Sequence, residues 1–217
     1  DRGRCDNMVT YATPTIAGVK GYAQYSFKVD NDADGTEGKN SSKRYAGVGL
    51  TYENGPLAAV IVYDTILNRA ADEVSKKDGR ALSVGGSYDF GAAKLFVAYQ
   101  YGENENWAGG VDAAGAKATV EGTDGKKKEI FKYGKQLDGH NFHLGVSIPV
   151  CAGTLNLAGY YTRAKATEDS AQKVKTFDVA ATYVYPLSKR TSVYAGVGYA
   201  QIKNTLENAA TDSRYEK

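Results

Sequence analysis

The 217-residue sequence has few of the residues that cross-link chains or bind metals: 2 cysteines, 2 histidines, 4 prolines, 1 methionine and 1 tryptophan. Cys5 and Cys151 are too far apart in the chain to form a CxxC or zinc-binding spacing. His140 and His143 are three residues apart in an expected strand, so they point to opposite faces. We therefore expect no metal site, no redox motif and no cofactor.

Neither sign of charge is in large excess, because the formal net charge is only +2. With this balance and no basic arm, we expect no nucleic-acid partner. The chain also lacks any apolar run of about 18 residues, the length of a membrane-spanning helix. Its longest apolar run, residues 57–63, has the length of a strand. A transmembrane β-barrel remains compatible with this, because its strands alternate over roughly 9–11 residues.

The arrangements that catalysis needs are missing as well. His143 shares a strand face with Ser147, but four residues along a strand separate them by roughly 13 Å, too far for a Ser-His pair. The glycine pairs at 85–86 and 109–110 lack the strand-to-helix context of a phosphate-binding loop. We therefore expect that the protein is not an enzyme.

Alternation with a period of two runs through most of the chain and predicts β-strands. It is clearest where Phe177, Val179, Ala181, Tyr183 and Tyr185 form one apolar face and the intervening residues are small or polar. After the polar turn at 186–190 the same pattern resumes, which predicts an antiparallel hairpin. About ten such strands are expected, at 7–12, 19–29, 45–52, 57–67, 81–90, 94–102, 140–150, 154–164, 177–185 and 192–201.

The connections between these strands alternate between short turns and long polar loops. Asn54-Gly55 is the strongest hairpin signal among the short turns. Long loops are expected near 30–43, 68–79, 103–138, 165–173 and 203–217. Short turns at one rim and long loops at the other are typical of outer-membrane barrels. A soluble β-sandwich gives no reason to separate its loops by length.

Aromatic residues gather at both ends of the expected apolar face. One set lies near the short turns: Tyr11, Tyr52, Tyr88, Phe90, Tyr183 and Tyr185. The other set lies near the long loops: Tyr25, Phe27, Tyr63, Tyr99, Tyr101, Tyr161 and Tyr199. Two such bands would form the interfacial girdles of a membrane barrel. The alternative is that tyrosine serves only as a good strand former. Since strand period and loop lengths agree, we predict an all-β, transmembrane antiparallel β-barrel.

Two segments of the chain carry motifs of a known family. The first is Arg4-Cys5-Asp6-Asn7-Met8-Val9-Thr10-Tyr11-Ala12-Thr13-Pro14, followed by Ala17-Gly18 and Ala23-Gln24-Tyr25-Ser26, and it resembles a segment of the general Gram-negative porins of the beta-proteobacterial type. The second is Tyr183-Val184-Tyr185-Pro186-Leu187-Ser188-Lys189-Arg190-Thr191, which resembles the turn before that family's penultimate strand. The resemblance covers essentially the whole chain and implies a single porin domain over 1–217.

The resemblance implies a barrel of 16 strands assembled as a homotrimer in the bacterial outer membrane. On this basis the chain would hold strands six to fifteen, without the preceding five, the inward-folded constriction loop or the final strand. The implied function is a water-filled channel for passive diffusion of small hydrophilic solutes and ions. Membrane lipid and lipopolysaccharide are the expected surroundings. The alternative is an adhesin or binding protein that acts through its long external loops.

If the apolar face meets lipid, the opposite side chains line the channel. We expect Arg2, Arg4, Lys20 and Lys28 as its basic residues, and Gln24, Asp64, Asp89 and Asp178 as its other polar residues. In the family that the chain resembles, a basic residue at the Arg4 position lines the constriction. We expect mild anion preference from this set. The alternative is that these charges only keep the channel wall solvated.

Overall fold

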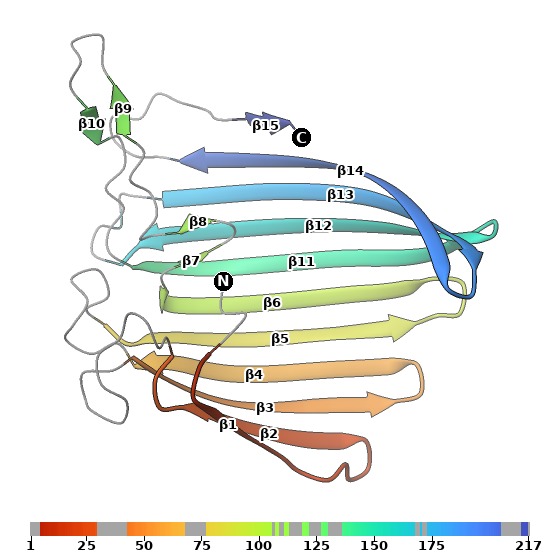
Figure 1. Ribbon diagram of the computed structural model, residues 1–217, viewed down its shortest axis with the longest axis horizontal. Coiled ribbons are helices and arrows are strands. Elements are labelled where there is room, and N and C mark those ends of the chain that lie inside the picture. Colours follow the sequence, from red (N-terminus) through yellow and green to blue (C-terminus); the bar gives the residue numbers. More distant parts are fainter. Residues whose placement is uncertain are drawn as a thin grey trace.

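The computed structural model describes residues 5–29, 43–67, 77–105, 136–167, 170 and 173–204, and the backbone of the short strands between 107 and 129 and at 214–216. Figure 1 shows that the long strands lie side by side, with the chain reversing at short turns at one end and at longer connections at the other. Their order in space is their order in sequence, so each is hydrogen-bonded to its sequence neighbours in the sheet.

The main sheet is antiparallel and has 11 strands. They are β1 (Met8–Ala12), β2 (Val19–Ser26), β3 (Arg44–Asn54), β4 (Leu57–Leu67), β5 (Gly79–Asp89), β6 (Lys94–Glu105), β11 (Leu137–Val150), β12 (Gly153–Ala166), β13 (Lys173–Ser188), β14 (Thr191–Asn204) and β15 (Arg214–Glu216). Two small hairpins pair β7 (Trp107–Ala108) with β8 (Val111–Asp112), and β9 (Thr119–Glu121) with β10 (Lys127–Glu129).

The ten strands expected from the alternating pattern are confirmed, and the loop bounds need correction. The segments 103–138 and 203–217 contain β7–β10 and β15, where only loop was expected. At the same end, β6 extends to Glu105 and β12 to Ala166, beyond the expected strand ends at 102 and 164. Backbone pairing needs no apolar side chain, so a ladder can continue past the alternating stretch that reveals it.

Two glycines shape the short-turn end. Gly55 has φ of 54° in the turn that joins β3 to β4, in the left-handed region that glycine adopts without strain. Gly18 has φ of 81°, and a Cβ at this position would collide with the carbonyl oxygen of Glu53. The hairpin predicted from Asn54-Gly55 is thus confirmed. Gly18 packs against the end of β3, at Glu53.

One face of the sheet is apolar and remains exposed. Register places Val48 opposite Tyr63, Tyr63 opposite Leu82, and Leu82 opposite Tyr101, so apolar rows cross strand after strand. At mid-strand, Leu144 is 59% exposed. Soluble monomers rarely expose contiguous apolar patches of more than a few hundred Å². We call this the outward face, and its exposure fits contact with lipid.

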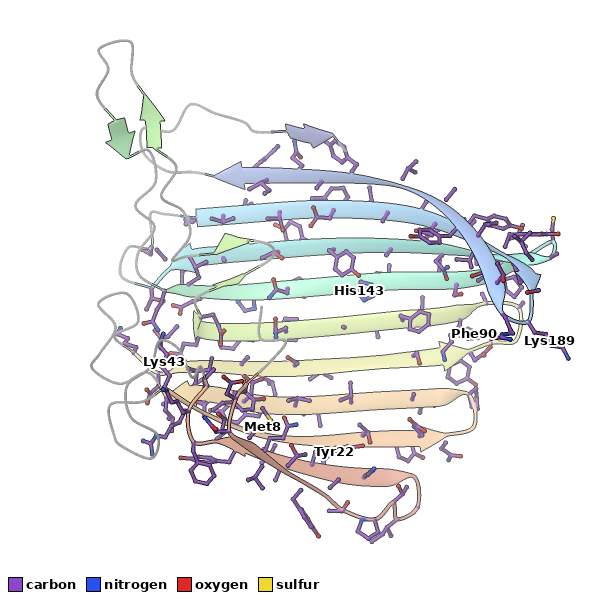
Figure 2. The ribbon with its side chains drawn as sticks, in the orientation of Figure 1. Met8, Tyr22, Lys43, Phe90, His143 and Lys189 are labelled. Atoms are coloured by element: carbon purple, nitrogen blue, oxygen red, sulfur yellow. The ribbon has the colours of Figure 1, made fainter. Side chains whose placement is uncertain are left out.

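The aromatic residues of the outward face fall into the two expected rows. Tyr88 lies opposite Leu57 and Leu95 near the short turns, whereas Phe142 lies opposite Tyr99 and Tyr161 near the long connections. Figure 2 shows Phe90 at the short-turn end and Lys43 at the other. The distribution matches two interfacial girdles of a membrane barrel.

The interior of a soluble sandwich is missing from this arrangement. A sandwich packs two sheets face to face, whereas the described long strands form one continuous sheet. Its few buried apolar residues lie toward the long-connection end: Ala81, Leu137, Ala164, Ala166 and Val174. The described part of the chain also contains no helix with the length and apolarity of a membrane span.

Adjacent residues of β11 provide a test of the two faces. Leu144 belongs to the outward face, while His143 points to the other. We expect Leu144→Arg to destabilise the folded protein in a lipid bilayer, lowering its free energy of unfolding by about 2–4 kcal/mol, because an arginine near the bilayer midplane is desolvated. Urea titration of the complete protein in lipid vesicles measures this change.

The matched control is His143→Arg, one residue away on the same strand. A charge on the wet side stays hydrated, so we expect a much smaller loss of folding free energy. Equal losses for the two variants would contradict the assignment of faces.

Candidate functional site: the polar face of the sheet

The face opposite the apolar one carries most of the polar side chains that lie within the strands. We call it the lumen face. Successive members of its mid-strand rows come from different strands, as where Ala98 lies opposite His143, His143 opposite Tyr160, and Tyr160 opposite Asp178. Every row is positioned by the backbone ladder, because residues that face each other across an antiparallel pair share one side of the sheet.

A hydrogen-bonded ladder of side chains crosses four strands of the lumen face. Gln100 Nε2 donates to Ser83 Oγ at 3.1 Å, and Asn141 Nδ2 donates to Gln100 Oε1 at 3.1 Å. Thr162 Oγ1 donates to Asn141 Oδ1 at 2.7 Å. No local sequence pattern predicts this ladder, since its members belong to β5, β6, β11 and β12 and meet only through the register.

The next row toward the short turns contains His143, Tyr160 and Asp178, whose polar groups can form hydrogen bonds. The His143 and Tyr160 rings stack with centroids 4.4 Å apart and an interplanar angle of 27°. Asp178 lies opposite Tyr160 on β13 and is half-buried. Figure 2 shows His143 near the middle of the sheet, far from either end of β11.

The two histidines point to opposite faces, as predicted. His140 Nδ1 lies 2.9 Å from the hydroxyl of Tyr99 on the outward face, whereas His143 stacks on Tyr160 on the lumen face. Within the described ranges, no three His, Cys, Asp or Glu side chains come together as a possible metal site.

Lys20 and Gln24 occupy the lumen face of β2. Lys20 lies opposite Thr51, and its Nζ is 5.2 Å from the centroid of the Tyr22 ring. Gln24 lies opposite Thr10 and donates from Nε2 to Thr10 Oγ1 at 3.3 Å. Both are half-buried. Two of the predicted channel-lining residues therefore lie on the same face of one strand, four positions apart.

Lys28 and Asp64 are more enclosed than a freely hydrated channel residue. Each is only 8% exposed. Asp64 lies on β4 opposite Gly47, and Lys28 follows the end of β2, where its carbonyl oxygen accepts a hydrogen bond from Asn7 Nδ2 at 3.4 Å. Their enclosure at the long-connection end reduces the surface that either exposes to water.

Asp89 lies at the short-turn end, away from the other predicted residues. Its Oδ1 accepts a hydrogen bond from Gly91 N at 2.8 Å, and its cross-strand partner is Lys94. Asp89 thus caps the β5–β6 turn. Arg2 and Arg4 lie outside the described residues, so their place on the lumen face stays a prediction.

The long-connection rim is held by side chains that sequence reasoning did not identify. Gln136 Nε2 donates to the carbonyl oxygens of Lys77 at 2.7 Å and Asn104 at 2.9 Å. Gln136 Oε1 accepts from Lys77 N at 3.1 Å, and the residue is 3% exposed. This glutamine ties the starts of β5 and β11 to the end of β6, and no local pattern could have shown it.

Comparison with known proteins agrees with this geometry. A Gram-negative porin family model matches residues 1–205. An outer membrane porin protein of Bordetella pertussis is 34% identical over 95% of this chain and 54% of its own length. Outer membrane porin protein 32 of Delftia acidovorans is 25% identical over 93% of this chain and 48% of its own length. The chain thus spans about half the length of the curated relatives that it matches.

Solved structures show the same fold. An anion-selective porin from Comamonas acidovorans superposes with a TM-score of 0.61 at 24% identity, over 98% of this chain and 54% of that one. OmpT of Vibrio cholerae superposes with a TM-score of 0.60 at 17% identity, over 91% of this chain and 55% of that one. With the family model matching nearly all its length, the chain belongs to the Gram-negative porin family of outer-membrane β-barrel proteins.

Proposed function

We propose that the protein forms a water-filled channel in the outer membrane, through which small hydrophilic solutes and ions diffuse passively. The observation that supports this most directly is the division of one sheet into an exposed apolar face and a polar face. When a sheet of this kind closes into a barrel of about 16 strands, it leaves an aqueous interior. The polar face then lines that interior, and its side chains set the preference among solutes.

The proposed channel carries out no chemical step and assembles as a homotrimer of closed barrels. Passive diffusion needs a wet wall without strong binding sites, which fits the hydrogen-bonded ladder from Ser83 to Thr162. The alternative of an adhesin acting through external loops draws no support from the described residues, whose organisation lies in the sheet. Trimer formation rests on the resemblance to porins.

We propose mild anion preference for this channel, dependent chiefly on Arg2 and Arg4. The described residues of the lumen face do not supply this preference alone, because their charges nearly cancel. The positive charge of Lys20 is offset in number by the negative charge of Asp178, and Lys28 and Asp64 are equally enclosed. Asp89 is opposed by Lys94 in its turn. Two additional arginines on the same face would tip this near balance toward anions.

Access from water gives a direct test of the channel. In the complete porin with Cys5→Ser and Cys151→Ser, we expect His143→Cys to react with a membrane-impermeant, charged thiol reagent and to lose part of its single-channel conductance. Planar-bilayer recording measures this loss. The reaction adds a bulky charge inside the proposed lumen, where it obstructs ion flow.

Leu144→Cys is the matched control, because its side chain faces lipid and the reagent should leave its conductance unchanged. Absence of any stepwise conductance in the unmodified porin would exclude the channel. Block of the Leu144→Cys variant alone would reverse the assignment of the two faces.

The reversal potential across a potassium chloride gradient tests the ion preference. We expect chloride to permeate somewhat better than potassium, and Arg2→Gln with Arg4→Gln to shift the reversal potential toward cation preference by removing two positive charges. Lys189→Gln, in the β13–β14 turn, serves as a control with a smaller effect. A preference for potassium in the unmodified porin would contradict the proposal.

A further inference from the structure

An open groove interrupts the lumen face at the level of His143. The row of residues that crosses the strands there runs from β4 to β11 as Val60, Gly85, Ala98 and His143. Because Gly85 and Ala98 have little or no side chain, the wall is low across β5 and β6 and rises at β4 and β11. The groove has a volume of about 500 Å³. This size is within the range of small-molecule sites in proteins.

One end of the groove is formed by an aromatic pair. The His143 and Tyr160 rings stack across β11 and β12, so Tyr160 covers one face of the imidazole. The opposite face is directed toward β6, where the register places Ala98. Val60, at the other end, is 38% exposed, and Tyr160 is 47% exposed. Exposed apolar surface rimmed by polar groups is typical of ligand-binding grooves.

The side of the groove toward the long connections is polar. The hydrogen-bonded ladder from Ser83 to Thr162 runs along it, about 7 Å along the strands from Ala98 and His143. Within the ladder, Gln100 and Asn141 each donate one amide hydrogen to a neighbour. A primary amide has two hydrogens and an oxygen with two lone pairs. Each amide therefore keeps capacity both to donate to a solute and to accept from one.

The charges around the groove favour a neutral occupant. Among the described residues that line it there is no lysine or arginine, and Asp178 is the one carboxylate. An anion in the groove would thus lack a cationic partner. A cation above Ala98 would be separated from Asp178 by the aromatic pair, since Asp178 lies beyond Tyr160 on β13. Neutral groups that donate and accept hydrogen bonds match the amides of the ladder better than either ion does.

We propose that this groove is a subsite for a neutral sugar in its pyranose ring form. The carbon-bound hydrogens on one face of such a ring pack against the imidazole of His143 and the floor at Gly85 and Ala98, while its hydroxyls reach the ladder. Because the groove is open to the lumen, it delays a sugar without trapping it, as conduction requires. This inference rests on the proposed channel, since it names a solute class for the wall of that channel.

Binding of methyl β-glucopyranoside to the complete porin in detergent, measured by saturation-transfer NMR, tests the subsite. We expect His143→Ala to weaken binding roughly twofold to tenfold, because it removes one ring contact. Gly85→Leu should abolish binding by filling the floor. A Cβ at Gly85 meets Val60 Cγ1 at 3.4 Å and Ala98 Cβ at 3.6 Å, which are ordinary contacts, so the sheet accommodates it. These variants change different parts of the groove, and either one alone is sufficient as a test.

The matched control is Phe142→Ala, which removes a ring one residue away on the outward face of β11 and should bind the glucoside as before. Two other solutes test the chemistry of the site. Sorbitol has hydroxyls but no ring face, and glucuronate adds a negative charge to the ring, so both should bind more weakly. Equal binding of either solute, unchanged binding by Gly85→Leu, or an equal loss in Phe142→Ala would overturn the subsite.

This measurement needs no ion flow, so it separates the subsite from the channel. A porin that conducts ions in a planar bilayer and binds no glucoside would retain the proposed function and overturn the subsite. Binding of the glucoside by a porin without stepwise conductance would confirm the groove and exclude the channel.

Discussion

The constraint on which this structure depends is the need to pair backbone groups where no water is available. In the hydrocarbon region an unpaired N–H or C=O costs several kcal/mol, so a sheet can cross only if its strands pair with neighbours. The strands from β2 to β14 in the main sheet each pair on both sides, and Figure 1 shows them in sequence order. This pairing fixes the register, and the register determines which side chains become neighbours on each face.

The features set by each strand alone were predictable from the sequence. Leu144 and His143 differ by one position, and the period of two is sufficient to send them to opposite faces. The β3–β4 hairpin could be predicted because Asn54-Gly55 carries its own turn chemistry. The aromatic rows followed as well, since their depth depends only on distance from a turn. The resemblance to porins added the number of strands, which alternation within this chain does not contain.

The features that depend on register or on distant segments could not be predicted. Gln100 and Asn141 are 41 residues apart, and the hydrogen bond between them exists only because β6 pairs with β11. The shift in register between Leu137 and Gly139 has no local signal. The same is true of the enclosure of Lys28 and Asp64, each only 8% exposed, which arises from several strands.

The two faces also treat their polar groups differently, and this difference connects structure with function. On the lumen face, Asn141 donates a hydrogen bond to Gln100, and Asp89 accepts one from Gly91 N. Groups that are mutually satisfied offer a hydrated wall without a deep binding site, as diffusion requires, since a solute must leave as readily as it enters. On the outward rim, Arg163 and Lys175 have like charge and are directly opposed. Like charges in cross-strand register destabilise a sheet, so this rim lacks the mutual satisfaction found on the polar face.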